Sequence, residues 1–106
     1  MPAKSGRSTE QDIAIAAMRY LATTQSGEAT IFAIKANADK FITFTPDDLE
    51  TSETRPHECM WEQQVRNIVS HRNNADNFVH GGLLEYRPRR LAITDAGRAW
   101  LKKKGY

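Results

Sequence analysis

Three histidines and one cysteine are the side chains best suited to bind a metal ion: His57, Cys59, His71 and His80. A structural zinc site usually takes its ligands from two spaced pairs. His57 and Cys59 are separated by one residue, and no second pair with suitable spacing follows. We therefore predict no metal site and no cofactor.

Cys59 also has the chemistry of a nucleophile. It lies at the start of an expected helix, which can lower the pKa of a thiol, and His57 is a neighbouring base. Nucleophilic catalysis also needs a third group that orients the base, and a site for the oxyanion. The sequence supplies neither, so we predict a buried or incidental cysteine.

Asp47, Asp48 and Glu50 could act as paired catalytic carboxylates. Asp47 and Asp48 directly follow Thr45-Pro46, however, and this order is typical of the first turn of a short helix, where the dipole favours acids. Gly81-Gly82 is not followed by the Lys-Ser or Lys-Thr of a phosphate-binding loop. We predict that the protein is not an enzyme.

The composition bounds the kind of protein. The chain has 106 residues, 40% hydrophobic and 26% charged, which predicts one globular domain. No apolar run reaches the ~18 residues of a membrane helix. Residues 1–8 are polar and are expected to form a flexible tail without a signal peptide. We therefore expect no membrane partner. With a single cysteine, no internal disulfide is possible, and we expect a reducing, cytoplasmic location.

The net charge is only +2, but it is unevenly distributed. Residues 51–106 hold ten basic and six acidic side chains, and residues 86–106 hold seven basic side chains and one acid. A concentrated positive field at one end of a domain favours a polyanionic partner.

The apolar periodicity predicts helices over residues 9–24, 31–40, 58–72 and 96–103. Short apolar segments predict strands at 28–30, 83–86 and 91–93, the last two joined by a turn at 87–90. Ser8, in a capping box with Gln11, is the expected cap of the first helix, and Thr30 and Thr94 are expected to cap later ones. This order predicts an α+β, mainly helical fold over residues 9–104. It is that of a winged helix-turn-helix with three helices, a short two- to three-stranded antiparallel wing sheet and a C-terminal helix.

The helix over 58–72 has the clearest amphipathic pattern. Its inward residues are expected to be Trp61, Val65, Ile68 and Val69, with Arg72 continuing this face. Its outward residues are expected to be Gln63, Arg66, Asn67 and Ser70, with His71 at their flank. Asn73 to Asn77 should end the helix, because these side chains compete for backbone hydrogen bonds.

Two segments resemble known families. Gly82-Leu83-Leu84-Glu85-Tyr86 and Leu91 to Arg98 resemble the wing of bacterial winged helix-turn-helix DNA-binding domains, in which a short basic turn joins two strands and a threonine caps the next helix. Trp61 to Asn67 resembles the start of the recognition helix in the N-terminal domain of Mrr-type restriction proteins. Together the resemblance covers residues 45–103. It implies a double-stranded DNA-binding module in a transcription regulator, or in an accessory to a restriction or phage system.

In such a module the recognition helix, here 58–72, enters the major groove. Base or phosphate contacts would then come from Gln63, Arg66, Asn67, Ser70 and His71. The basic wing, 86–91, would bring Arg87, Arg89 and Arg90 to the backbone or the minor groove. A shift of one residue in the hairpin would swap faces, so the outward arginine is not fixed. The alternative is a winged-helix protein–protein interaction module, and we expect a monomer or weak homodimer.

Overall fold

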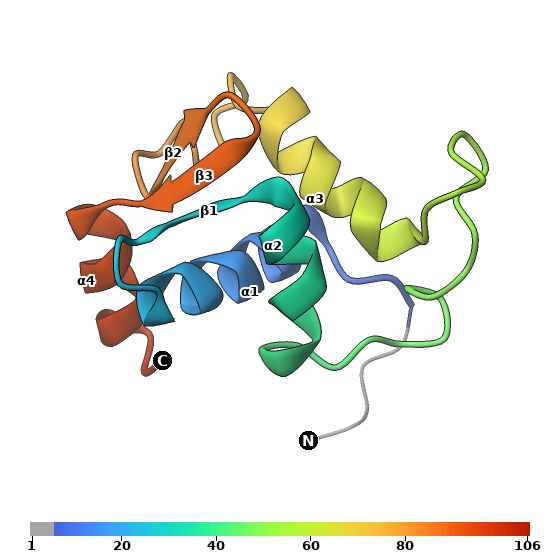
Figure 1. Cartoon of the computed structure of the whole chain (residues 1–106), viewed down its shortest axis with the longest axis horizontal. Coiled ribbons are helices and arrows are strands. Elements are labelled where there is room, and N and C mark those ends of the chain that lie inside the picture. The colour runs from blue at the N-terminus through green and yellow to red at the C-terminus, as the bar shows by residue number, and fades with distance from the viewer. Residues whose placement is uncertain (1–5) are drawn as a thin grey trace.

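A computed structural model describes residues 6–106, which form four helices and one three-stranded antiparallel sheet (Figure 1). The elements in chain order are α1 (Glu10–Thr23), β1 (Glu28–Thr30), α2 (Ile31–Asn37) with a 3-10 turn (Ala38–Lys40), α3 (Met60–Ser70), β2 (Leu84–Arg87), β3 (Arg90–Ile93) and α4 (Asp95–Lys103). The predicted order of helices and strands is confirmed. The fold is therefore a small α+β arrangement. Within residues 6–106, none of the helices is long and apolar enough to span a bilayer.

The last strand of the chain is the central strand of the sheet. The strand order is β1–β3–β2, and both neighbours pair with β3 in antiparallel register, Ala29 opposite Leu91 and Glu85 opposite Ala92. Arg87 pairs with Arg90, so the hairpin turn is only Pro88-Arg89. Arg89 has a φ of 63°, and proline followed by a positive φ is the pattern of a type II turn.

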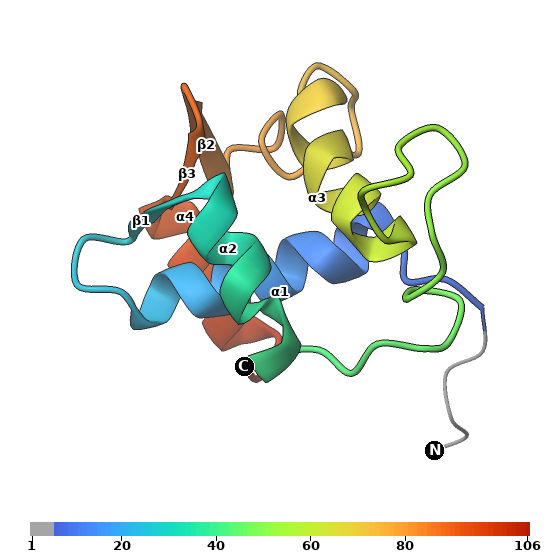
Figure 2. The same cartoon turned by 45° about the vertical axis from the view of Figure 1, so that its right-hand side comes forward.

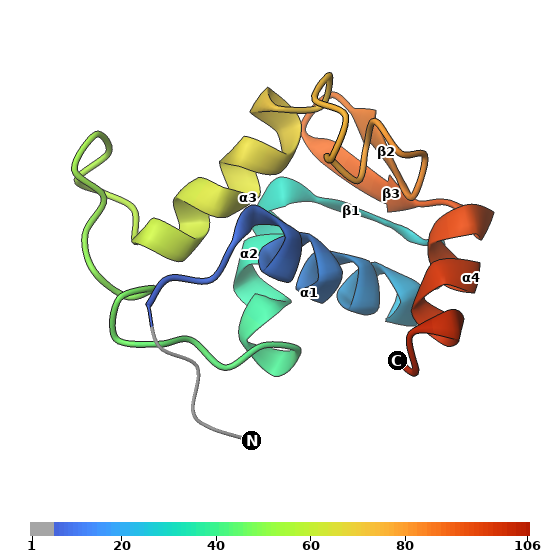
Figure 3. The ribbon, with the colours of Figure 1, turned by 180° about the vertical axis from the view of Figure 1, so that it is seen from behind.

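α1 carries most of the core. Ile13, Ala17, Met18 and Leu21 are fully buried on its inward faces. α1 contacts α2, α3, α4 and β3, and from behind it crosses the molecule between α3 and α4 (Figure 3). The other elements contribute buried apolar side chains from their inward faces: Ile34, Val65, Ile68, Leu84, Leu91, Ile93 and Leu101.

The predicted cap of α1 at Ser8 is wrong by one residue. Thr9 is the cap: its hydroxyl accepts a hydrogen bond from Asp12 N (3.0 Å), and the Asp12 carboxylate accepts one from Thr9 N (2.9 Å). Ser8 is instead buried against Asp48, whose carboxylate accepts from Ser8 N at 2.6 Å and from Ser8 Oγ at 2.7 Å. Asp48 thus takes the hydroxyl that the sequence pattern assigned to α1. Of the predicted tail, residues 1–5 lie outside the described residues.

The segment 41–59 lies beside the start of α3 (Figure 2). Thr45 begins a single turn, where the sequence predicts the first turn of a short helix, and its hydroxyl accepts from Asp48 N at 3.1 Å. Burial by itself would raise the pKa of Asp48, but hydrogen bonds from Ser8 and Thr45 outweigh it and lower that pKa. A bridge between Thr51 and Cys59 closes the second half of the segment. The first turn of α3 is therefore held against this segment.

The predicted cap at Thr94 is confirmed, and it joins α4 to the hairpin. Its hydroxyl accepts from Gly97 N (2.9 Å) and donates to Gly82 O (2.6 Å). A Cβ on Gly97 would lie 2.2 Å from Leu83 O, so only glycine allows this approach.

Candidate nucleic-acid interface

α3 presents the face on which the sequence places the recognition residues. Val65 and Ile68 are buried, and Trp61 and Val69 are partly buried against the core, as predicted. Arg72 does not continue this inward face. It follows the end of α3, is exposed, and its guanidinium lies 4.8 Å from the centre of the Tyr86 ring on β2. This cation–π contact joins the end of α3 to the hairpin.

The predicted outward residues share the solvent side of α3, but most are bound to other side chains. Gln63 Oε1 accepts from Ser52 Oγ at 2.8 Å, and Asn67 Nδ2 donates to Gln64 Oε1 at 3.1 Å. Arg66 Nη2 lies 2.8 Å from a carboxylate oxygen of Glu58. Ser70 is exposed, and its hydroxyl has no hydrogen bond within residues 6–106. Ser70 is therefore the free hydroxyl at the C-terminal end of this face.

His71 lies at the end of α3, where its Nδ1 is 2.7 Å from Glu10 Oε1. The other oxygen of Glu10 accepts from Nδ2 of buried Asn77 at 3.0 Å. His71 thus faces α1, on the flank of the outward face. Its imidazole belongs to a contact that holds the polar segment 73–77 onto the core.

The three hairpin arginines have different electrostatic surroundings. Arg87 pairs with Glu28 and, at 3.2 Å, with Glu85. Hydrogen bonds to these two carboxylates raise the pKa of Arg87. Arg90 also lies 3.4 Å from Glu28. Arg89 is exposed in the turn, and its guanidinium has no ion pair within the described part of the chain. The structure therefore selects Arg89 as the hairpin's unneutralised charge, which the sequence left open.

A groove of about 340 Å³ joins α3 to the hairpin tip and α2. Its lining combines four cations and two carboxylates with apolar and hydroxyl side chains: Ile31, Lys35, Arg55, Glu58, Glu62, Val65, Arg66, Val69, Ser70, Tyr86 and Arg89. Two of its walls, the start of α2 and the hairpin turn, are joined by a hydrogen bond from Ile31 N to Arg89 O at 2.9 Å. The sequence-based prediction omitted Lys35 and Arg55. Lys35 lies on α2 and Arg55 in an irregular loop, and both reach the groove through tertiary contacts that no local sequence signal marks.

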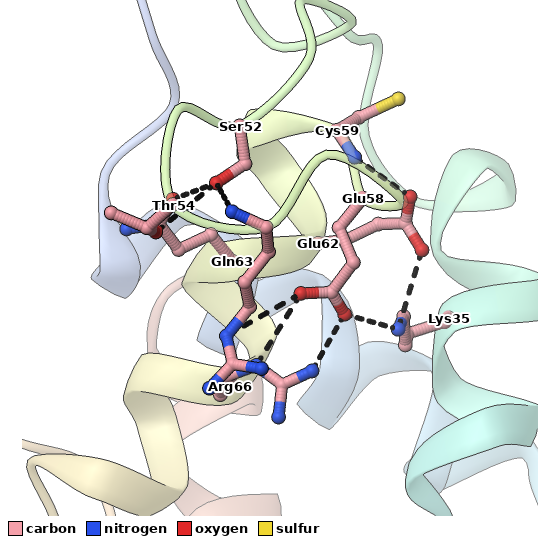
Figure 4. A network of polar contacts seen from close by, with 9 residues as sticks. Lys35, Ser52, Thr54, Glu58, Cys59, Glu62, Gln63 and Arg66 are labelled. Atoms are coloured by element: carbon pink, nitrogen blue, oxygen red, sulfur yellow. Dashed lines mark hydrogen bonds and ion pairs between the residues drawn. The ribbon is translucent and has the colours of Figure 1, made fainter.

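Glu58 is the anionic centre of the groove (Figure 4). Its Oε2 lies 3.0 Å from Lys35 Nζ and 2.8 Å from Arg66 Nη2, and Oε1 lies 3.4 Å from Arg66 Nε. The side chain is only 10% exposed. Burial opposes ionisation, but Arg66 and Lys35 outweigh it and lower the pKa of Glu58. Glu62 lies 3.3 Å from the same lysine. The free protein thus holds two carboxylates, Glu58 and Glu62, inside a groove that four cationic side chains also line.

Cys59 caps α3, but its thiol is not activated there. Burial, with the nearby Glu62 carboxylate, raises the pKa of Cys59, because both disfavour a thiolate. A protonated thiol is a poor nucleophile at neutral pH. Over residues 6–106, no three His, Cys, Asp or Glu side chains are arranged to hold a metal ion.

Comparison with protein-family models, with curated proteins and with solved structures gave no match for this chain.

Proposed function

We propose that the protein is a winged helix-turn-helix module that binds double-stranded DNA, in a regulator or in an accessory to a restriction or phage system. The order of elements supports this, because three helices precede the β2–β3 hairpin, and β1 pairs with β3 as the third strand of the sheet. The resemblance of residues 82–98 to a wing supports the same assignment. In this arrangement α3 enters the major groove and the β2–β3 hairpin follows the backbone.

One observation carries the proposal: the exposed side of α3 and the hairpin tip line the same basic groove. Arg66 and Ser70 come from α3, Arg89 from the turn, and Lys35 from α2. A duplex seated on α3 would lie close to these cations. Phosphate contacts of this kind supply most of the salt-dependent affinity of DNA-binding proteins.

The ion pairs predict different contributions of the three hairpin arginines to phosphate binding. Arg89 contributes a full charge to an incoming phosphate. Arg87 and Arg90 are largely offset by Glu28 and contribute less. Base reading falls to Asn67 and Gln63, when their intramolecular hydrogen bonds are exchanged for base contacts, whereas Arg66 and Ser70 line the groove that faces the backbone.

The test is fluorescence anisotropy with a labelled random-sequence duplex at about 50 and 200 mM salt, the range over which phosphate contacts weaken strongly. Wild type should bind at low salt and lose affinity steeply with salt. Arg89→Gln should lower the logarithmic salt slope by about 0.9, the value of one phosphate contact. Arg87→Gln should lower it clearly less. Lys40→Gln, an exposed charge that does not line the groove, is the matched control.

Two results would overturn the proposal. One is no duplex binding by wild type at the lower salt concentration. The other is an equal loss of slope in all three variants, because net charge alone would then explain binding.

A protein-interaction module is the second candidate, and one observation favours it. Phe32 on α2 is 82% exposed beside a shallow groove shared with Ile31, Ala36 and Trp61. A large exposed aromatic ring next to apolar surface is typical of protein contacts. Absence of duplex binding, together with concentration-dependent sedimentation that Phe32→Ser removes, would favour this candidate.

A further inference from the structure

We propose that the groove between α2, α3 and the hairpin is a phosphate-binding site, and that the Glu58 carboxylate occupies the phosphate position in the free protein. The inference rests on the proposed function for the source of the phosphate, which is the backbone of duplex DNA. It assigns Glu58 as an internal competitor of that phosphate.

The geometry of Arg66 carries the first step. Nε and Nη2 of Arg66 both face the Glu58 carboxylate, at 3.4 and 2.8 Å from its two oxygens. A guanidinium binds carboxylate and phosphate with the same two-pronged geometry. The place filled by Glu58 therefore has the shape and charge that a phosphate requires. Lys35, at 3.0 Å from the same carboxylate, would contact the phosphate from the α2 side.

The surroundings favour exchange of one anion for another. Arg89 and Ser70 line the same groove, and neither side chain has a hydrogen bond or ion pair within the described residues. Each of the two non-bridging oxygens of a backbone phosphate can accept more than one hydrogen bond, so a phosphate bound to Arg66 and Lys35 could also accept from Arg89 or Ser70, which line the same groove. Glu58 cannot engage this second pair while it lies in the fork of Arg66.

Release of Glu58 requires only a side-chain rotation. Its backbone is fixed, because Glu58 N donates to Arg55 O at 2.9 Å and Glu58 O accepts from Ser52 N at 2.8 Å. The following residue is fixed by the bridge to Thr51. The segment 50–59 can therefore stay folded on α3 while the carboxylate turns out to water. Competition by Glu58 would weaken binding to isolated phosphates and leave the groove to ligands that also contact α3 and the hairpin.

The experiment compares duplex affinity for wild type, Glu58→Gln and Glu53→Gln. Glu53 is exposed in the same segment and has no ion pair within residues 6–106, so it controls for the loss of one negative charge. Glu58→Gln should bind about three to ten times more tightly than Glu53→Gln, the effect of removing a partly buried competing ion pair. In an Arg66→Gln background this gain should disappear. Glu58→Asp keeps the charge but shortens its reach, and it should show a smaller gain even if Glu58→Gln folds poorly.

A second arm uses inorganic phosphate against chloride at equal ionic strength, with the melting temperature as the readout. Phosphate should raise the melting temperature of Glu58→Gln more than that of wild type. Phosphate stabilisation without any duplex binding would refute the DNA-binding proposal and leave the phosphate site standing. If the duplex binds, equal duplex affinity of Glu58→Gln and Glu53→Gln, or a gain that survives Arg66→Gln, would overturn the phosphate site. If no duplex binds, an equal effect of phosphate on the melting temperatures of Glu58→Gln and wild type would overturn it.

Discussion

Replacing Asp48 by asparagine should destabilise the protein strongly, although the two side chains have nearly the same shape. The Asp48 carboxylate is buried, with the residue 1% exposed. One oxygen accepts from Ser8 N (2.6 Å), and the other accepts from Ser8 Oγ (2.7 Å) and Thr45 N (3.0 Å). An asparagine has one acceptor oxygen, so in either orientation its NH₂ group would face a backbone N–H.

The magnitude follows from these contacts. The substitution removes at least one charge-assisted hydrogen bond and leaves a buried donor unsatisfied, at a cost of about 2–3 kcal/mol. For a domain of this size, the melting temperature should fall by roughly 10–20 °C. Asp47→Asn is the control, because it removes the same charge from the neighbouring residue, whose carboxylate has no hydrogen bond within residues 6–106.

The pH dependence gives an independent check. The pKa of Asp48 is lowered in the folded protein, so its ionised form adds stability above the ordinary pKa of aspartate, about 3.9. That stability is lost as the pH falls through the lower, folded-state pKa. Urea unfolding at several pH values should show the gap between wild type and Asp48→Asn narrowing below about pH 4. A melting temperature for Asp48→Asn equal to that of Asp47→Asn would refute the reasoning.

The remaining predictions concern two contacts: the packing of Gly97 in α4 against Leu83 before the hairpin, and the hydrogen bonds of Asn77 to the end of α3. Gly97→Ala should lower the free energy of unfolding by about 1–2 kcal/mol in urea titrations, because overpacking against Leu83 O outweighs the better helix propensity of alanine. An unchanged or raised value would mean that α4 moves away freely. Asn77→Ala should cost about 2 kcal/mol or more, because Val79 N (2.7 Å from Asn77 Oδ1) and Ile68 O (3.0 Å from Nδ2) lose their partner. Hydrogen exchange should then quicken at Val79, and an unaltered rate there would contradict this role.

The sequence was sufficient for the elements whose signals are local. Val65 and Ile68 are three positions apart on one helix face, and the structure buries both, as predicted. The threonine caps at Thr30 and Thr94 also depend on residues a few positions away, and the structure confirms both. The cap at Ser8 failed because its partner, Asp48, lies 40 residues away in the sequence. Two adjacent hydroxyls at 8 and 9 each fit the local pattern, and a tertiary contact decided between them.

The candidate site was predictable only in part for the same reason. Helical spacing identified the exposed side of α3, and composition identified the basic hairpin. The partners that neutralise Arg87 and occupy Arg66 come from Glu28 and Glu58, which lie in different elements. No spacing rule links them to those arginines, so the difference between free Arg89 and its paired neighbours required the tertiary structure.

The strand order has a consequence for synthesis. β1 emerges from the ribosome early and β2 much later, yet neither has a pairing partner until β3, residues 90–93, has also emerged. The nascent chain therefore carries β1 unpaired through most of translation, whereas β2 waits only for the few residues that separate it from β3. The sheet can close only after long-range pairing of Glu28 with Ala92, a contact of the kind that slows folding. Loss of residues 90–93 by premature termination or proteolysis would remove both strand pairings at once.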